Sequence, residues 1–197
     1  VGRVRVEGVL DEDDFQARCD AYGFGKLKQE QIVDAYHRRH GIPHVTLRPG
    51  AVFGPGKRAL SGRVGIDTFG VFLHLGGSNR IPLTFVDNCA EAIVLAGSAP
   101  GVDGEVANVV DDDLPSSRSL LRGYKRHAGR FWSLPVPYPV AWWLSAAWED
   151  YSRRSGEQLP PRFNRRRCAA EWKGNRYSNA KLKRLLGWTP RVPMDEA

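Results

Sequence analysis

The order of helical patterns and short apolar segments is the feature that most limits the fold of this chain. Residues 21–40 show a helical pattern, with Leu27 and Tyr36 roughly on one stripe, and Gly41 is a good C-terminal stop. The segment PHVTLRPG comes next and predicts a short buried strand over residues 45–47. Because a helix followed closely by an apolar strand is half of a βαβ unit, we predict an α/β fold.

Later segments continue this alternation. We predict a strand in RIPLTF and a helix over residues 88–97, with Asp87 as its N-cap. The segment GEVANVV predicts another short strand. Further helices are predicted over residues 66–77, over residues 117–128 and in the amphipathic tail YSNAKLKRLLGWTP.

The composition indicates one globular unit with a basic surplus. With 197 residues, 42% of them hydrophobic, the chain can build one sizeable core, or one domain and a small lobe. The net charge is +7, but the basic residues are dispersed, which favours small anions over nucleic acid as ligands. Three widely separated cysteines argue against a disulfide framework and a zinc site. We therefore expect a reducing, cytoplasmic location.

The most apolar stretch is FWSLPVPYPVAWWLSAAW, residues 131–148, which approaches the length of a membrane span. Its three prolines and two serines favour a buried or half-buried helix over membrane contact. Four of the six tryptophans lie here, and sugar stacking and a membrane belt are alternative roles for them. We interpret them as core packing of a small lobe.

Metal-ligand patterns are missing from the sequence. The histidines show no HExxH or other ligand spacing, so we predict no metal site; they are His37, His40, His44, His74 and His127. Residues 111–113 are three consecutive aspartates, but adjacent turn residues point in different directions, and we interpret them as a solvated loop. Cys19 precedes the helix without an adjacent base, which is typical of a small buried residue.

The segment AYGFGK places Tyr22 and Lys26 four residues apart at the start of the first predicted helix, where both side chains share one face. A lysine ammonium beside a phenol stabilises the phenolate and lowers its pKa from about 10, which makes the tyrosine usable as a general acid or base. Gly23 and Gly25 each weaken a helix by roughly 1 kcal/mol relative to alanine. We interpret them as keeping the helix thin where a ligand approaches.

Five segments, in this order, resemble the C-terminal part of an extended short-chain dehydrogenase/reductase of the NAD-dependent epimerase/dehydratase family. YGFGK resembles the family's YxxxK motif, and LRPGAVFGPG resembles its RPxxVYGP segment, with Phe53 where tyrosine is common. FVDNCAEAIVLA, GEVANVV and YSNAKLKRLLGWTP resemble a following helix start, strand and closing helix. Together the matches cover most of residues 20–193.

The resemblance implies a partial Rossmann-type, doubly wound parallel sheet with a small, mostly helical C-terminal substrate lobe. Residues 1–115 are then expected to form the C-terminal part of an NAD(P)-binding domain, with substrate-lobe insertions. Residues 116–197 are expected to form mainly the substrate-binding lobe and the closing helix. A homodimer, if formed, would use the helix that bears Tyr22.

The resemblance also implies roles for individual residues. Tyr22 is the catalytic acid or base, and Lys26 binds the nicotinamide ribose and tunes Tyr22. The nicotinamide end of the cofactor, NAD with NADP as the alternative, would lie along Pro49, Gly50, Val52 and Phe53.

Several arginines are expected to bind the substrate. Arg58 and Arg63 follow the FGPG turn, where family members often place substrate-binding groups. Arg162, together with the triplet at residues 165–167, can clamp a diphosphate through bidentate hydrogen bonds. For any single arginine, a solvated basic face is the alternative.

Two parts of the family pattern are missing. The Gly-rich turn that seats the cofactor pyrophosphate has no match. The family's catalytic serine or threonine, which precedes the tyrosine, is also missing, because no Ser or Thr precedes Thr46. The chain begins with Val1, so we expect a fragment that lacks the first part of the fold. Such a fragment should bind NAD poorly or not at all.

The expected activity is NAD(P)-dependent transient hydride transfer on a nucleotide sugar, as an epimerase, dehydratase or reductase. Two alternatives stay open. A 3β-hydroxysteroid-dehydrogenase-like oxidoreductase would suit the apolar, Trp-rich lobe. A non-catalytic regulator or adaptor with the same fold would suit a chain that lacks the cofactor seat.

Overall fold

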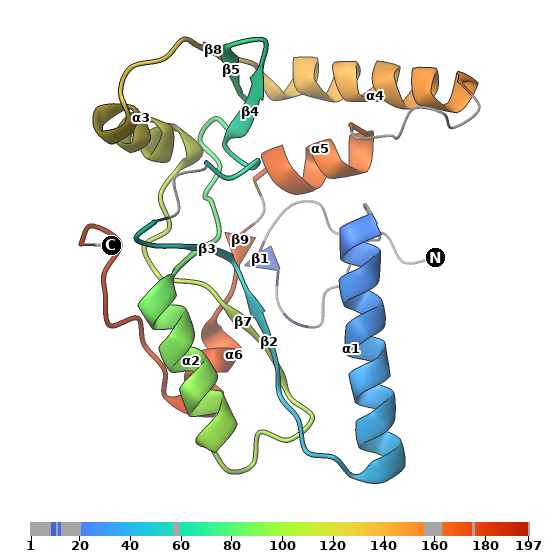
Figure 1. Cartoon of the computed structure of the whole chain (residues 1–197), viewed down its shortest axis with the longest axis vertical. Helices are drawn as coiled ribbons and strands as arrows, with labels where there is room; N and C mark the ends of the chain where they lie inside the picture. The colour runs from blue at the N-terminus through green and yellow to red at the C-terminus, as the bar shows by residue number, and fades with distance from the viewer. Residues whose placement is uncertain are drawn as a thin grey trace.

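The computed structural model describes residues 9–10, 12, 21–56, 60–155, 163–174 and 176–196, and the structural statements below refer to these residues. Its helices and strands are interspersed along the chain (Figure 1). In chain order they are β1 (Val9–Leu10), α1 (Ala21–His40), β2 (Thr46–Pro49), β3 (Ala51–Phe53), β4 (Gly65–Thr68), β5 (Val71–His74), β6 (Leu83–Phe85), α2 (Val86–Ser98), β7 (Val106–Val109), α3 (Ser117–Ala128), β8 (Ser133–Pro135), α4 (Tyr138–Arg154), α5 (Arg165–Trp172), β9 (Arg176–Tyr177) and α6 (Ala180–Leu186).

Parallel pairing defines the central sheet. β2 pairs with β7 and β3 pairs with β6, both in parallel, which confirms the predicted α/β fold class. The chain changes partner at Gly50, whose N–H donates to the Val109 carbonyl, while the next N–H, of Ala51, donates to the Pro82 carbonyl. A Cβ on Gly50 would lie 2.7 Å from the Pro82 oxygen, so only glycine fits this crossing without a shift.

Helices lie on both sides of these strands. Figure 1 shows β2 and β7 between α1 on one side and α2 on the other. On the α2 side, Ala92 and Leu182 from the helices pack against Ala107 and Val109 of β7, and Trp188 closes this buried cluster. The helix predicted in the tail is confirmed as α6, which ends at Gly187 with the left-handed φ of 61°.

A buried asparagine fixes the C-terminal segment against this cluster. Asn88 is fully buried in the first turn of α2, and its Oδ1 accepts hydrogen bonds from the backbone N–H groups of Arg191 and Val192. Its Nδ2 donates to the Val192 carbonyl and to Asp111 Oδ1. The side chain therefore joins α2, the end of β7 and the C-terminal segment, with both its polar atoms satisfied.

Asp111 differs from the expectation of a solvated loop. Its side chain is buried, and its Oδ2 accepts a hydrogen bond from the backbone N–H of Phe85 at the start of α2. Burial raises the pKa of Asp111 above its ordinary value, although the hydrogen bonds from Phe85 and Asn88 act in the opposite direction. The predicted N-cap is also wrong, because Phe85 holds the N-cap position and Asp87 lies within the first turn.

The segment predicted as a helix over residues 66–77 is instead an antiparallel hairpin of β4 and β5. Phe69 and Gly70 form its turn, with φ values of 49° and 77°. Burial alternates along β5, where Phe72 and His74 are buried and Val71 is exposed, which is the two-residue period of a strand. β5 also pairs in parallel with β8, so the hairpin belongs to a small three-stranded sheet.

The Trp-rich stretch forms β8 and most of α4, but it does not pack mainly in a core as predicted. Trp132 is 85% exposed and Trp143 is 65% exposed. Trp172 and Trp188, outside this stretch, are the buried tryptophans. Among the described residues, no helix combines the length and the apolar character needed to cross a membrane.

We predict that Asn88→Ala lowers the free energy of unfolding by about 2–4 kcal/mol, because it leaves several buried polar groups without partners. Urea denaturation followed by far-UV circular dichroism measures this change. The control is Asp87→Ala, an exposed neighbour in the same helical turn, for which a loss below about 1 kcal/mol is expected. Equal losses for the two variants would contradict the role assigned to Asn88.

Candidate active site

The first turns of α1 carry the predicted catalytic motif. The backbone of Tyr22 lies in the helix, whereas its side chain lies outside the described part of the structure. Lys26 is exposed, and its Nζ donates a hydrogen bond to Gln29 Oε1 at 3.1 Å. Because residues four apart share a helix face, the backbone is compatible with the expected pair, and the pairing itself stays a prediction.

Packing does not explain the glycine at position 25 of α1. Among the described residues, no atom would lie within 4 Å of a Cβ built on Gly25, and the same holds for the helical glycines Gly97 and Gly123. Packing within the described chain therefore does not require glycine here, and alanine would favour the helix by roughly 1 kcal/mol. This differs from Gly50, whose lack of a side chain is explained by the Pro82 backbone.

The predicted cofactor-binding segment spans the end of β2 and all of β3. Pro49 is exposed, and Gly50 occupies the crossing between the two strand pairings. The Phe53 ring packs edge-on against Phe85, with ring centroids 5.5 Å apart, so it also contributes to the core. Val52 lies between them on β3, opposite Thr84 of β6.

A half-buried ion pair holds α1 against β2. Arg48 donates from Nη2 to Glu30 Oε2 at 2.7 Å and from Nε to Glu30 Oε1 at 3.1 Å, and the two side chains are only 22% and 25% exposed. Arg48 Nη1 also donates to the Glu12 carbonyl. Two parallel hydrogen bonds fix direction as well as distance. This bidentate pair therefore sets where the motif helix lies relative to the strand that continues into Pro49.

The sequence reasoning did not assign a role to either member of this pair. Arg48 was visible as the arginine of the LRPG segment, and Glu30 as an acid two turns after Tyr22. The available signal was an arginine in an otherwise apolar strand, which needs a partner once it is half-buried.

The predicted substrate arginine Arg63 has structural partners. Its guanidinium donates to the Ala170 carbonyl at 3.2 Å and to the Tyr177 hydroxyl at 3.3 Å, and it lies over the Tyr177 ring. It therefore ties the loop before β4 to α5 and β9. Arg58 and Arg162, the other predicted substrate arginines, lie outside the described residues, as does Cys19.

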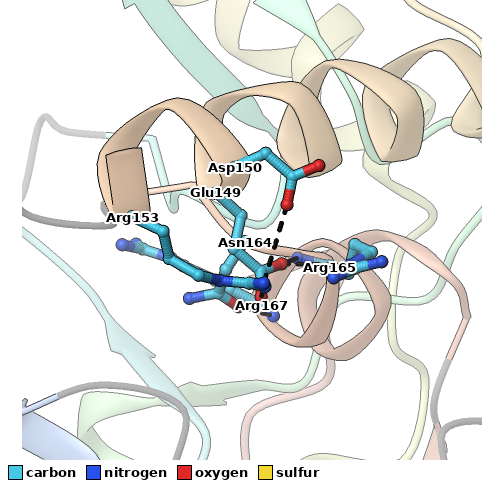
Figure 2. A network of polar contacts seen from close by, with 6 residues as sticks. All are labelled: Glu149, Asp150, Arg153, Asn164, Arg165 and Arg167. Atoms are coloured by element: carbon cyan, nitrogen blue, oxygen red, sulfur yellow. Dashed lines mark hydrogen bonds and ion pairs between the residues drawn. The ribbon is translucent and has the colours of Figure 1, made fainter. Parts of the chain in front are cut away.

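Two arginines of the triplet at the start of α5, Arg165 and Arg167, also have partners within the chain (Figure 2). Glu149 of α4 accepts from Arg153 at 2.6 Å and from Arg165 at 3.1 Å. Arg167 pairs with Glu171 at 3.0 Å, and its backbone N–H is capped by the Asn164 side chain. Arg165 and Arg167 thus hold α5 together and join it to α4, which is a different role from the predicted diphosphate clamp.

The carboxylate at the centre of this network is electrostatically stabilised. Burial acts to raise the pKa of Glu149, but the hydrogen bonds from Arg165 and Arg153 outweigh it and lower the pKa to about 2. Glu149 is therefore ionised at every physiological pH, and the contact between α4 and α5 is a charged one.

The site residues and the lobe lie toward the same end of the molecule. Figure 1 shows the first turn of α1 and the C-terminal ends of β2 and β7 directed toward the part of the molecule that carries α4 and α5. In open α/β sheets, ligands bind outside the carboxyl ends of the strands. The start of α1 therefore lies at the end of the strands where α/β folds bind their ligands (Figure 1).

The family model for the NAD dependent epimerase/dehydratase family matches residues 4–109. The chain belongs to this family, which confirms the resemblance and the expected class of cofactor at the level of the family.

Curated relatives divide between two substrate classes. The sterol-4-alpha-carboxylate 3-dehydrogenase (decarboxylating) of Candida albicans is 28% identical over 200 residues, covering 91% of this chain and 55% of that protein. The corresponding enzyme of Mus musculus is 27% identical and covers 90% and 52%. An uncharacterized UDP-glucose epimerase of Bacillus subtilis is 23% identical and covers 75% and 48%. The chain thus spans about half the length of these relatives.

Solved structures share the fold. The UDP-glucuronic acid 4-epimerase of Bacillus cereus, in complex with UDP-glucuronic acid and NAD, superposes with a TM-score of 0.67 at 20% identity, covering 96% of this chain and 54% of that one. The RMD protein of Pseudomonas aeruginosa, complexed with NADPH, gives a TM-score of 0.63 at 15% identity and covers 95% and 56%.

The described residues expected to face the nicotinamide half of the cofactor are accessible. Lys26 and Pro49 are exposed, and no described atom would lie within 4 Å of a Cβ on Gly25, so a nicotinamide ribose can reach them; that they bind it stays a prediction. The pyrophosphate half would need a Gly-rich turn that opens a helix, and the glycines after β3 lead into no helix within the described residues.

We predict that the Arg48–Glu30 pair contributes about 1–2 kcal/mol to stability, between the values for exposed and fully buried pairs. A double-mutant cycle with Arg48→Met and Glu30→Gln measures this coupling in urea. Hydrogen exchange should accelerate across α1 in both variants. The control is Asp34→Asn, which removes the exposed pair with Arg38 on the same helix and should cost less than about 0.5 kcal/mol. A coupling energy near zero would contradict the anchoring role.

The depressed pKa of Glu149 predicts an acid-sensitive contact between α4 and α5. Because the folded pKa of about 2 lies below the ordinary value of 4.5, the contact stabilises the fold above pH 4.5 and is lost as the pH falls toward 2. The hydrogen-exchange protection factors, which correct for the intrinsic pH dependence of amide exchange, should therefore fall in this range over residues 138–154 and 165–172. In Glu149→Gln these protection factors should already be low at pH 7 and should depend less on pH in this window. An unchanged pH profile in that variant would refute the assignment.

Proposed function

We propose that the chain provides the catalytic motif and the substrate lobe of an NAD(P)-dependent oxidoreductase that acts on the hydroxyl of an apolar, sterol-like substrate. The residue roles, the lobe and the substrate class are all proposed here. The observation that carries the substrate class is the pairing of Arg165 and Arg167 with Glu149 and Glu171.

A diphosphate clamp needs guanidinium groups whose hydrogen bonds are available to the ligand. Releasing Arg165 would leave the half-buried Glu149 with fewer counter-charges, and releasing Arg167 would do the same to Glu171. Arg63 is likewise engaged with Ala170 and Tyr177. Breaking any of these arginine contacts would cost free energy and so weaken the binding of a nucleotide. A substrate without phosphates does not require these contacts to break.

Apolar side chains are exposed on the lobe instead. They lie on three neighbouring elements, β5, β8 with the residue before it, and α4. β5 pairs with β8, and α4 follows β8 in the chain. The set includes Val71, Trp132, Leu134, Trp143 and Leu144. Surfaces of this kind gain free energy by covering an apolar ligand, at about 25 cal/mol per Å² of apolar area removed from water.

The chemistry assigned to this chain is proton transfer. The nicotinamide cofactor, when bound, supplies the acceptor or donor of a hydride. Tyr22 Oη removes the proton of the substrate hydroxyl as its carbon is oxidised, and it returns that proton in the reverse direction. Lys26 holds the cofactor ribose and stabilises the charged form of Tyr22. Arg48 and Glu30 keep both residues in place relative to β2.

A nucleotide sugar is the second candidate substrate, and one observation favours it. The C-terminal end of α3 and the loop after it line an open hollow of about 560 Å³ with Arg122, Lys125, Arg126 and Arg130. Four cations around one hollow are suited to an anionic ligand. This set is different from the arginines that the sequence analysis selected.

Ligand binding to the 197-residue chain separates the two candidates. We expect a soluble sterol 4α-carboxylate to bind and to change the tryptophan fluorescence, whereas UDP-glucuronic acid should bind at least about tenfold more weakly, a difference of about 1.4 kcal/mol. Isothermal titration calorimetry gives both affinities.

Two variants serve as matched controls. Trp143→Ala should weaken sterol binding by several-fold, since it removes a large exposed aromatic side chain from the lobe. Arg126→Ala should leave sterol binding unchanged. Preferential binding of UDP-glucuronic acid, weakened by Arg126→Ala, would overturn the sterol-like assignment in favour of the nucleotide sugar.

A further inference from the structure

Three potential metal ligands that are distant in sequence meet at the C-terminal end of α1. His37 lies in the last turn of α1, His44 lies just before β2, and Asp103 lies in the loop before β7. One ligand atom from each side chain lies within 4.8 Å of the other two. The two imidazole rings meet edge-on, with centroids 4.9 Å apart, and His37 Nδ1 lies 3.5 Å from Asp103 Oδ1.

Backbone hydrogen bonds orient two of these side chains. Asp103 Oδ1 accepts from the backbone N–H of His44 at 2.8 Å. His37 Nδ1 lies 2.9 Å from the Ile42 carbonyl oxygen, which can only accept; in the tautomer in which Nδ1 donates to this oxygen, Nε2 has the lone pair that an ion would need. A protein metal ligand of the histidine type normally has its second ring nitrogen held in this way.

His44 contributes a second, independent observation. Its Nδ1 is shielded from solvent and has no hydrogen-bond partner among the described residues. Buried polar side-chain atoms normally have a partner, so an orphaned imidazole nitrogen next to another histidine and a carboxylate requires an explanation. A bound cation would supply the missing partner, because neutral imidazole nitrogen is a preferred ligand of zinc and related metals.

We propose that His37, His44 and Asp103 bind a divalent transition-metal ion, with Zn²⁺ as the best match to two imidazoles and one carboxylate. Ligand distances of about 2.0–2.2 Å in tetrahedral geometry place donor atoms about 3.3 Å apart. Side-chain movements of about 1–2 Å therefore close the present arrangement around an ion. Three protein ligands leave the fourth position to water.

The site is structural in this proposal. His37 follows Tyr22 by fifteen residues, so at 1.5 Å per residue the cluster lies about 22 Å from the catalytic turn along the helix axis. The ion would join the end of α1 to the loops before β2 and β7, the two paired strands. The spacing of ligands in the sequence could not indicate this cluster, because Asp103 follows His44 by 59 residues and only the fold brings the two together.

Metal titration of the purified chain tests the proposal. After removal of metal with a chelator, ZnCl₂ titrated into the chain in a calorimeter should bind with a stoichiometry of one and raise the melting temperature. Co²⁺ should give the ligand-field absorption of a four-coordinate site. His37→Asn and Asp103→Asn should each weaken Zn²⁺ binding at least tenfold, and Asp103→Asn keeps an acceptor for the His44 N–H.

His40→Asn is the matched control, because His40 is exposed on the same helix, lies outside the cluster and should leave the affinity unchanged. Far-UV circular dichroism shows whether each variant folds. If His37→Asn fails to fold, the Zn²⁺ affinity of Asp103→Asn decides the result. Absence of stoichiometric binding to the unaltered chain, or equal affinity in the variants and the control, would overturn the proposal. In that case the three side chains form a polar cluster without an ion.

Discussion

The bidentate contact between Arg48 and Glu30 is the constraint on which the candidate site depends. The catalytic motif lies on a helix, whereas the segment expected to face the nicotinamide continues from a strand, and the two come from different layers of the fold. Apolar packing alone does not fix α1, since Ile32, Val33 and Tyr36 remain exposed. The half-buried pair with its two parallel hydrogen bonds fixes the orientation of α1 relative to β2. Rotation of either side chain would break a hydrogen bond and leave a charge without its partner in a partly desolvated position.

Sequence reasoning was reliable where local rules decide the structure. The bounds of α1 and α3 and the position of β7 agree with it, since helical periodicity and short apolar runs are local signals. It failed for β4 and β5, where an apolar run with glycine was interpreted as a helix. The deciding event there is a two-residue turn with positive φ at Phe69, a conformation that is uncommon for a non-glycine residue and that here accompanies the pairing of the flanking strands.

The candidate site shows the same division between local and long-range information. The Tyr22–Lys26 spacing on one helix face can be read from sequence, because it depends on a single helix, although the contact between the two side chains stays a prediction. The roles of the arginines cannot be read from sequence, because Arg165 forms an ion pair with Glu149 on another helix, and Arg63 donates hydrogen bonds to uncharged groups more than a hundred residues away. Asp111 is a further case: it looked solvated among neighbouring acids, yet long-range contacts with Phe85 and Asn88 bury it.

Two polar anchors therefore act on α1 at different points. Glu30 holds its middle to β2, and His37 approaches Asp103 and His44 at its C-terminal end. A contact at one end of a helix stabilises the other end only through the cooperativity of helix formation. Gly25 weakens this coupling, because it lowers the helix propensity between Glu30 and Tyr22. The turn that carries the proposed acid or base is thus less stabilised by the helix itself than the turns that anchor it. Ligand contacts are well suited to order such a turn, since binding and active-site segments are commonly drawn from the less stable parts of a fold.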